Sequence, residues 1–84
     1  MPNRERPPDM TTYKGRLGAN VRARRKQLKL SQAALSKLLV QHGADVTVPA
    51  LSNYEVGNRA IQLEHLPAFA KALETSIRKL MPES

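Results

Sequence analysis

The stretch that decides the fold is LSQAALSKLLVQHGADVTVPALSNYEVGNR, residues 30–59. Ser31 is a residue type that caps helices, because its hydroxyl accepts a hydrogen bond from a free N–H of the next turn. The segment Gln32–Gln41 has the apolar spacing of a short amphipathic helix, and Gly43 suits the turn just past its end. These residues predict a capped helix followed by a turn.

A second short helix follows this turn. Thr47 or Val48 caps it, because Pro49 suits a first-turn position and biases the residue before it away from helical angles. Gly57 ends it. Two short helices joined by a turn make a helix-turn-helix, a motif whose second helix reads the major groove of DNA. The stretch therefore predicts a recognition helix over about residues 48–55.

Helical spacing also governs the rest of the chain. The apolar positions predict a first helix over about residues 14–28, a fourth from about Leu66 to Leu73, and a short fifth that Ser76 caps and Pro82 stops. With no strand pattern, we expect an all-α fold of five short helices. The expected core consists of apolar side chains on the inner faces: Leu17, Val21, Leu28, Leu35, Leu38, Leu51, Tyr54, Leu66, Phe69, Ala70, Leu73, Ile77 and Leu80.

The 84 residues have room for one small domain. Residues 1–12 hold three prolines, four charges and, after the initial Met1, a single large apolar residue, Met10, so we expect a flexible basic arm there. Arg4 and Arg6 suit an arm that follows a DNA groove, and a leader without any role explains them equally well. The helix-turn-helix domain is expected over residues 13–82, with 83–84 as a tail.

Composition limits the cellular compartments in which the protein is expected. The chain has no cysteine, which excludes disulfides and thiolate metal sites and fits a reducing compartment. The longest apolar run, Leu38–Val40, is too short to cross a bilayer, and the N-terminus has no hydrophobic signal segment. We therefore expect a cytoplasmic protein without a membrane segment.

Positive charge is concentrated near the N-terminus. The net charge is +7; residues 1–30 hold nine basic and two acidic side chains, while residues 31–84 hold five of each sign. This polycation indicates a phosphate-binding surface, and a merely solvated basic face is the simpler alternative. A membrane-surface role fits poorly, because no broad Trp, Phe and Leu face accompanies the charges. Arg24 and Arg25 lie on or beside the apolar stripe of the first helix and need to snorkel or find a carboxylate.

Two segments resemble the Cro/CI (Xre) family of helix-turn-helix regulators from phages and bacteria, namely VRARRKQLKLSQAALSKLL and SNYEVGNRAIQLEHLPAFAKAL. The resemblance covers about residues 18–81. It implies a five-helix, lambda-repressor-like fold and sequence-specific binding of double-stranded DNA by a transcriptional regulator, more often a repressor than an activator. It also implies a homodimer that binds two half-sites about 34–36 Å apart.

The resemblance assigns roles by position. Base reading falls to the exposed face of the third helix: Val48, Pro49, Ser52 and Asn53. Phosphate contacts fall to residues that flank the two motif helices, to which the basic segment adds two: Gln32, Thr47, Asn58, Arg59, Lys14 and Arg16. Val48, Pro49 and Ala50 offer only van der Waals contact, best suited to thymine methyl groups, whereas Asn53 can pair bidentately with adenine.

Two further assignments concern structure and assembly. Arg25 and Glu55 match a salt bridge that, in this family, links the first helix to the end of the third and sets the angle of the recognition helix. The fifth helix and C-terminus match a dimer contact made by three apolar residues: Ile77, Leu80 and Met81. For Met81, a place in the core is an equal alternative.

The chain departs from the family between the two motif helices. From Ser31 to Glu55 it has about five residues more than the common pattern, and QHGAD is the expected insertion. We therefore expect an extended connection between the second and third helices and an altered docking geometry.

No set of residues suits catalysis or metal binding. Glu55 lacks a second carboxylate or a nucleophile, and His42 and His65 lack the spacing of a zinc site. We expect no enzymatic activity, no cofactor and no metal. The competing prediction is an antitoxin-like or adaptor protein that acts mainly through a protein partner. The apolar start of the third helix permits it, but only three residues follow Met81, where a toxin partner usually needs an apolar extension.

Overall fold

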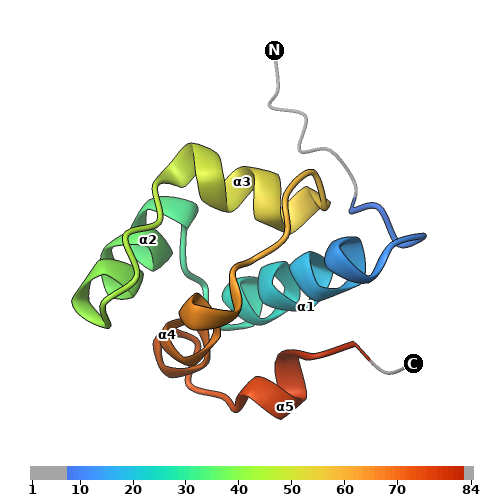
Figure 1. The fold of residues 1–84 in the computed structure, drawn as a ribbon. Coiled ribbons are helices and arrows are strands. Elements are labelled where there is room, and N and C mark those ends of the chain that lie inside the picture. Colours follow the sequence, from blue (N-terminus) through green and yellow to red (C-terminus); the bar gives the residue numbers. More distant parts are fainter. Residues whose placement is uncertain (1–7, 83–84) are drawn as a thin grey trace.

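Helices account for most of residues 8–82, which are the residues that the computed structural model describes (Figure 1). Their bounds are Tyr13–Gln27 (α1), Gln32–Gln41 (α2), Val48–Val56 (α3), the 3₁₀ turn Leu63–His65 (η1), Leu66–Ala72 (α4) and Ile77–Leu80 (α5). No strand occurs in this part of the chain. The expected all-α class is confirmed, and each helix lies within one or two residues of its predicted place.

Side-chain caps set the helix starts. The hydroxyl oxygens of Ser31, Thr47 and Ser76 each accept a hydrogen bond from the backbone N–H three residues on, at 3.0, 3.3 and 3.2 Å. Of the two candidate caps for α3, Thr47 is therefore the one used, and Val48 is the first helical residue. Gly57 ends α3 with a φ of 88°, a left-handed conformation that costs a residue with a Cβ atom about 1–2 kcal/mol.

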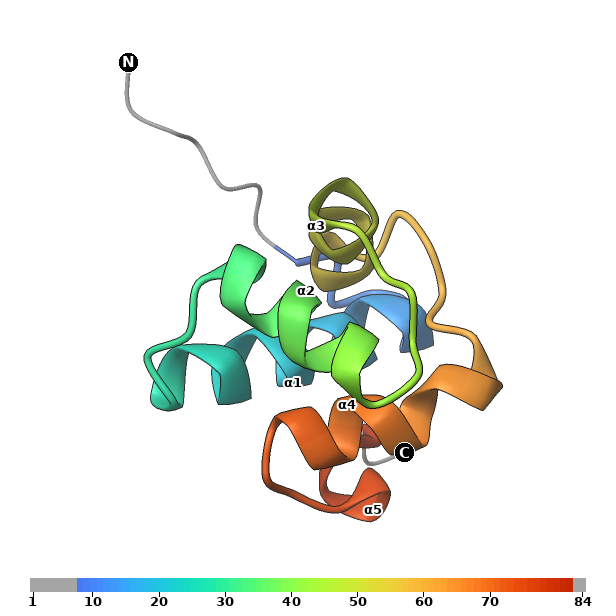
Figure 2. The ribbon, with the colours of Figure 1, turned by 90° about the vertical axis from the view of Figure 1, so that its left-hand side faces the viewer.

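The helices form a closed ring of contacts around one core (Figures 1 and 2). Each packs against the next in the order α1, α3, α2, α4, α5, and α5 returns to α1. At the centre the ring of Tyr54 on α3 meets that of Phe69 on α4 edge to face, with centroids 6.3 Å apart. This packing places α3 and α5 on opposite sides of α1.

The predicted core is confirmed with three exceptions. Leu28 and Leu38 are half-buried, and Ile77, in the first turn of α5, is 37% exposed. Several buried residues lie outside the predicted set: Leu39, Ala44, Val46, Ile61, Ala68 and Ala72.

The extended connection between α2 and α3 folds back onto α2. Ala44 and Val46 are buried, the Ala44 N–H donates to the Leu39 carbonyl at 2.8 Å, and the Ser36 hydroxyl donates to the Val46 carbonyl. The added residues are therefore part of the packed domain.

Glycines allow α1 and the end of α3 to cross closely. A Cβ atom on Gly18 would lie 1.9 Å from the carbonyl oxygen of Tyr54, and one on Gly57 would lie 2.7 Å from the Cα atom of Gly15. Only residues without side chains permit this approach, which brings the end of the recognition helix onto α1.

The folded domain begins earlier than residue 13. The Asp9 N–H donates to the Val56 carbonyl at 3.1 Å, and Thr12 caps α1 by accepting from the Gly15 N–H at 3.0 Å. Hydrogen bonds from the hydroxyl and N–H of Thr11 hold the pKa of the Asp9 carboxyl below its ordinary value of 3.8. Asp9 and Thr12 of the predicted arm are therefore hydrogen-bonded to the helical domain. Residues 1–7 of that prediction lie outside the described part of the chain, as does the predicted tail 83–84.

Candidate nucleic-acid interface

Helix α3, which the sequence predicted to be the recognition helix, presents one face to solvent and buries the other. The buried face consists of Leu51, Tyr54 and Glu55. The opposite face carries the four residues predicted to read bases, of which three are exposed and the last is half-buried: Val48, Pro49, Ser52 and Asn53. The geometry therefore leaves these side chains accessible to a DNA groove.

A buried ion pair holds the back of α3. Glu55 is 2% exposed and Arg25 5%. The Arg25 Nε atom lies 2.7 Å from Glu55 Oε2, Nη2 lies 3.0 Å from Oε1, and Nη1 donates to the Leu30 carbonyl at 2.8 Å. A two-pronged, charge-assisted contact of this kind constrains direction as well as distance. It ties α1 to the C-terminal half of α3.

Gln32, expected to contact a phosphate, also joins this network. Its Nε2 atom donates to Glu55 Oε1 at 3.1 Å, so the start of α2 is coupled to α3. The amide nitrogen carries a second N–H donor besides this one. The sequence did not predict a hydrogen bond between Gln32 and Glu55, because the two residues are far apart in the chain.

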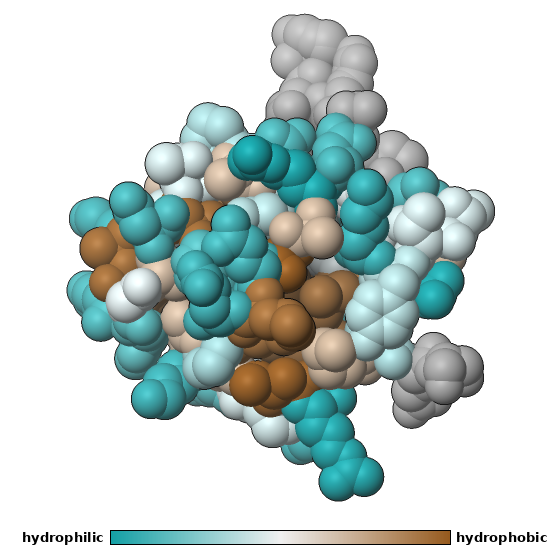
Figure 3. Space-filling view, viewed as in Figure 1, coloured by the Kyte–Doolittle hydropathy of each residue, from teal (hydrophilic) through white to brown (hydrophobic). Residues whose placement is uncertain are grey.

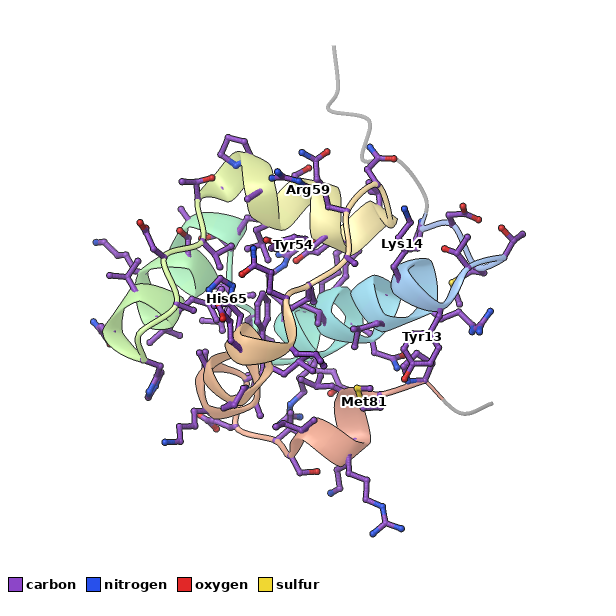
Figure 4. All side chains as sticks on the ribbon, in the orientation of Figure 1. Tyr13, Lys14, Tyr54, Arg59, His65 and Met81 are labelled. Carbon is purple, nitrogen blue, oxygen red and sulfur yellow. The ribbon has the colours of Figure 1, made fainter. Side chains whose placement is uncertain are left out.

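The backbone N–H groups in the turn after α3 donate hydrogen bonds to α3 itself. The N–H groups of Asn58 and Arg59 donate to the Asn53 carbonyl at 2.9 and 3.3 Å, and Asn58 Nδ2 donates to Asn53 Oδ1 at 3.4 Å. The backbone near Asn58, expected to hold a phosphate, therefore caps α3. The side chains of Asn58 and Arg59 are exposed, and Figure 4 shows Arg59 on the side of the molecule that carries α3.

Lys14 and Arg16 face different sides of the molecule. Lys14 is exposed and extends toward the side of α3 (Figure 4). Arg16 donates from Nη1 to the Met10 carbonyl at 3.3 Å, and its guanidinium lies 5.9 Å from the centroid of the Tyr13 ring. It borders a hollow next to α5. Arg16 therefore borders the α5 side of the molecule, whereas Lys14 extends toward α3.

Arg24 is a structural residue of a kind not foreseen from the sequence. It neither snorkels nor pairs with a carboxylate; Nε donates to the Leu73 carbonyl at 2.8 Å and Nη2 to the Glu74 carbonyl at 3.1 Å. The guanidinium thereby caps the C-terminus of α4, where a positive charge is favourable. In a similar contact, Asn20 Nδ2 donates to the Leu80 carbonyl at 2.7 Å.

The three residues expected at a dimer contact have different environments. Leu80 is 2% exposed and belongs to the chain's own core, so its side chain is not available to a partner. Ile77 is partly exposed, and Met81 is half-buried beside Tyr13, whose hydroxyl lies 3.9 Å from its Sδ atom (Figure 4). Apolar side chains gather in the middle of the face shown in Figure 3, between α1, α4 and α5.

Other kinds of site find no support in residues 8–82. Within that range, no three His, Cys, Asp or Glu residues come together to hold a metal ion, and no helix is long and apolar enough to cross a membrane.

The fold and the exposed α3 define a helix-turn-helix domain. A sequence profile of the helix-turn-helix family matches residues 21–80, and the chain belongs to this family in its Cro/CI (Xre) form. It is a DNA-binding domain of the kind found in transcription regulators. No curated protein sequence matches the chain.

Solved structures give the same fold. The restriction-modification controller protein C.AhdI from Aeromonas hydrophila is 27% identical with a TM-score of 0.68, over 79% of this chain and 92% of that one. The BldD DNA-binding domain from S. venezulae is 27% identical with a TM-score of 0.69, over 83% and 97%. Hydroxypropylphosphonic acid epoxidase from S. wedmorenis is 36% identical with a TM-score of 0.58, over 80% of this chain and 33% of the epoxidase.

Proposed function

We propose that this protein binds specific double-stranded DNA sites with α3 in the major groove and represses transcription from bacterial or phage promoters on the nucleoid in the cytoplasm. The observation that carries the proposal is the division of α3 into two faces. The inner face is held by the buried pair of Arg25 and Glu55, while the outer face is exposed. A helix fixed at its back and accessible at its front is prepared to enter a groove without reorganisation.

Base reading is assigned to four residues on that outer face. Asn53 is suited to pair bidentately with adenine, a contact worth about 1–3 kcal/mol of discrimination, once its 3.4 Å contact with Asn58 is released. Val48 and Pro49 suit thymine methyl groups, and Ser52 suits a single hydrogen bond. Because few side chains here form directional contacts with bases, the shape of the DNA contributes to the choice of site.

Phosphate contacts are assigned to side chains that border α3 or face the same side. They are the second amide N–H of Gln32, the hydroxyl of Thr47, the side chains of Asn58 and Arg59, and the ammonium group of Lys14. These residues flank the reading face, so they suit the two sugar-phosphate strands on either side of a groove.

We further propose that the protein binds as a two-fold dimer through Ile77 and Met81. Both lie at the α5 end of the molecule, and neither is fully buried in the chain's own core. Dimers of this class bind two half-sites one helical turn apart, about 34–36 Å, and we expect the same spacing here.

In vitro selection of DNA sites tests the proposal. We expect the wild-type protein to select an inverted repeat with half-sites about one turn apart. Asn53→Ala is expected to lose preference at one position of each half-site, whereas Arg59→Ala weakens binding to all sequences alike. An unchanged preference for Asn53→Ala would remove the base-reading assignment, and the absence of any selected sequence would remove sequence-specific binding.

A second candidate is a helical module that acts mainly on a protein partner. The 36% identity to one third of an epoxidase favours it, since that protein uses a similar domain within a larger chain. A mobility shift on the gene's own upstream DNA, run beside a pull-down from the same cells, separates the two candidates.

A further inference from the structure

A hollow is lined by residues from the start of α1 and from α5. Figure 1 shows α5 across α1 from α3. Its volume is about 740 Å³, within the range of small-molecule sites. Three cationic side chains border it, Arg16, Arg78 and Lys79. It is therefore a positively charged concavity separate from the proposed DNA interface.

The positive charges of this hollow have no acidic counterpart on its walls. Among residues 8–82, no carboxylate lines it; Glu74 lines an adjoining hollow of about 340 Å³, which shares Lys79 and Asn20 with the larger one. Three like charges around one concavity repel one another and favour a bound anion. Guanidinium groups are well suited to two-pronged contacts with phosphate.

The hollow also has an apolar part held in a defined position. Met10, Met81 and Pro82 contribute to its lining. The Tyr13 hydroxyl lies 3.9 Å from the Sδ atom of Met81, and Figure 4 shows the two side chains next to each other. Polarizable methionine side chains make favourable contacts with aromatic rings.

One of the cations is also held in place before any ligand arrives. Arg16 is half-buried, donates to the Met10 carbonyl at 3.3 Å and stacks over the Tyr13 ring. A cation restrained in this way loses little side-chain freedom when it binds an anion.

We propose that this hollow is a binding site for a small organic phosphate that carries an aromatic or apolar ring. The phosphate binds among Arg16, Arg78 and Lys79, and the ring lies against Met10, Met81 and Pro82. None of the lining residues belongs to α3, so the site is separate from the proposed base-reading face, although it shares Met81 with the proposed dimer contact.

Nuclear magnetic resonance titration with three probes at fixed ionic strength tests the proposal. Phenyl phosphate carries the ring and the charge, inorganic phosphate carries the charge alone, and benzyl alcohol carries the ring alone. We expect phenyl phosphate to shift the backbone signals of Arg16, Asn20 and residues 76–81, with an affinity at least tenfold above that of either other probe.

Charge-neutral variants complete the test. The double variant R78Q/K79Q is expected to lose at least tenfold in affinity for phenyl phosphate, whereas Lys71→Gln, an equal change per site on exposed α4 surface, leaves it unchanged. Circular dichroism checks that each variant is folded. The proposal is overturned if inorganic phosphate binds as well as phenyl phosphate, if the double variant binds normally, or if the shifts map to α3.

Discussion

At the scale of single residues, the Glu55 carboxylate is the group that links α3 to the two helices beside it. It accepts hydrogen bonds from Arg25 and Gln32, so one side chain of α3 is fixed by both α1 and α2. Burying a charged group lowers the stability of the fold unless the group is paired. Removing one member of a buried ion pair lowers stability more than removing both members does. The sequence resemblance implied the partner Arg25, but only the folded chain shows that Gln32 shares the carboxylate.

Replacement of Arg25 tests this network. Arg25→Met leaves Glu55 buried without its charge partner and is expected to lower the free energy of unfolding by about 3–5 kcal/mol. The double variant R25M/E55M is expected to be more stable than Arg25→Met, because it removes the uncompensated charge. Urea unfolding of the wild type, both single variants and the double variant measures the coupling. Costs that simply add would show that the pair has no structural role.

At the scale of elements, the crossing of α1 and α3 depends on missing side chains. The Gly18 Cα atom faces the Tyr54 carbonyl, where a Cβ atom would lie at 1.9 Å. In an ordinary helix, alanine is more favourable than glycine by about 1 kcal/mol. At position 18, the close contact between α1 and α3 favours glycine over alanine.

Gly18→Ala is therefore expected to destabilise the domain, by about 1–3 kcal/mol, because α3 has to move away from α1. The same movement shifts the reading face, so DNA affinity falls as well. Thermal unfolding and a mobility shift measure the two effects. The direction of the change in melting temperature decides the outcome. An increase would mean that α1 and α3 do not approach each other this closely.

In the turn after α4, a residue with a side chain adopts a backbone conformation that favours glycine. Glu74 has a φ of 55°, a left-handed conformation that costs a residue with a Cβ atom about 1–2 kcal/mol and glycine almost nothing. Glu74→Gly is therefore expected to raise stability by about 0.5–1 kcal/mol, after the larger entropy that glycine loses on folding is subtracted.

The matched variant is Glu64→Gly, which removes the same charge from η1, where φ is not positive. It is expected to lower stability by about 0.5–1 kcal/mol. Differential scanning calorimetry distinguishes the two, since about 1 kcal/mol shifts the melting temperature of a domain this size by roughly 4–8 °C. Equal losses from both variants would contradict the explanation.

At the scale of the whole molecule, the concentration of positive charge near the N-terminus does not translate into one phosphate-binding surface. Arg25 is buried in an ion pair, Arg24 caps α4, and Arg16 faces the α5 side. Lys14, by contrast, extends toward the side of α3. The fold thus divides a continuous basic segment between stability and two different surfaces.

The salt dependence of DNA binding reports this division. Each phosphate contact adds about −0.9 to the slope of log K against log salt concentration. Lys14→Gln is expected to reduce the slope by about 0.9 per subunit, whereas Arg16→Gln, an equal change of charge two residues away, leaves it unaltered. Equal slopes for the two variants would return Arg16 to the DNA interface.

Local signals in the sequence determined the elements and the family. The caps Ser31, Thr47 and Ser76, the glycine that ends α3 and the apolar spacing act within a few residues, so the helices follow from local chemistry alone. Tertiary structure decided what each basic residue does and which connecting residues are buried. Ala44 and Val46 have no periodic signal, and Arg24 binds carbonyl groups 49 and 50 residues away. Such contacts depend on where distant segments meet, which is set by the closed ring of helices around the core.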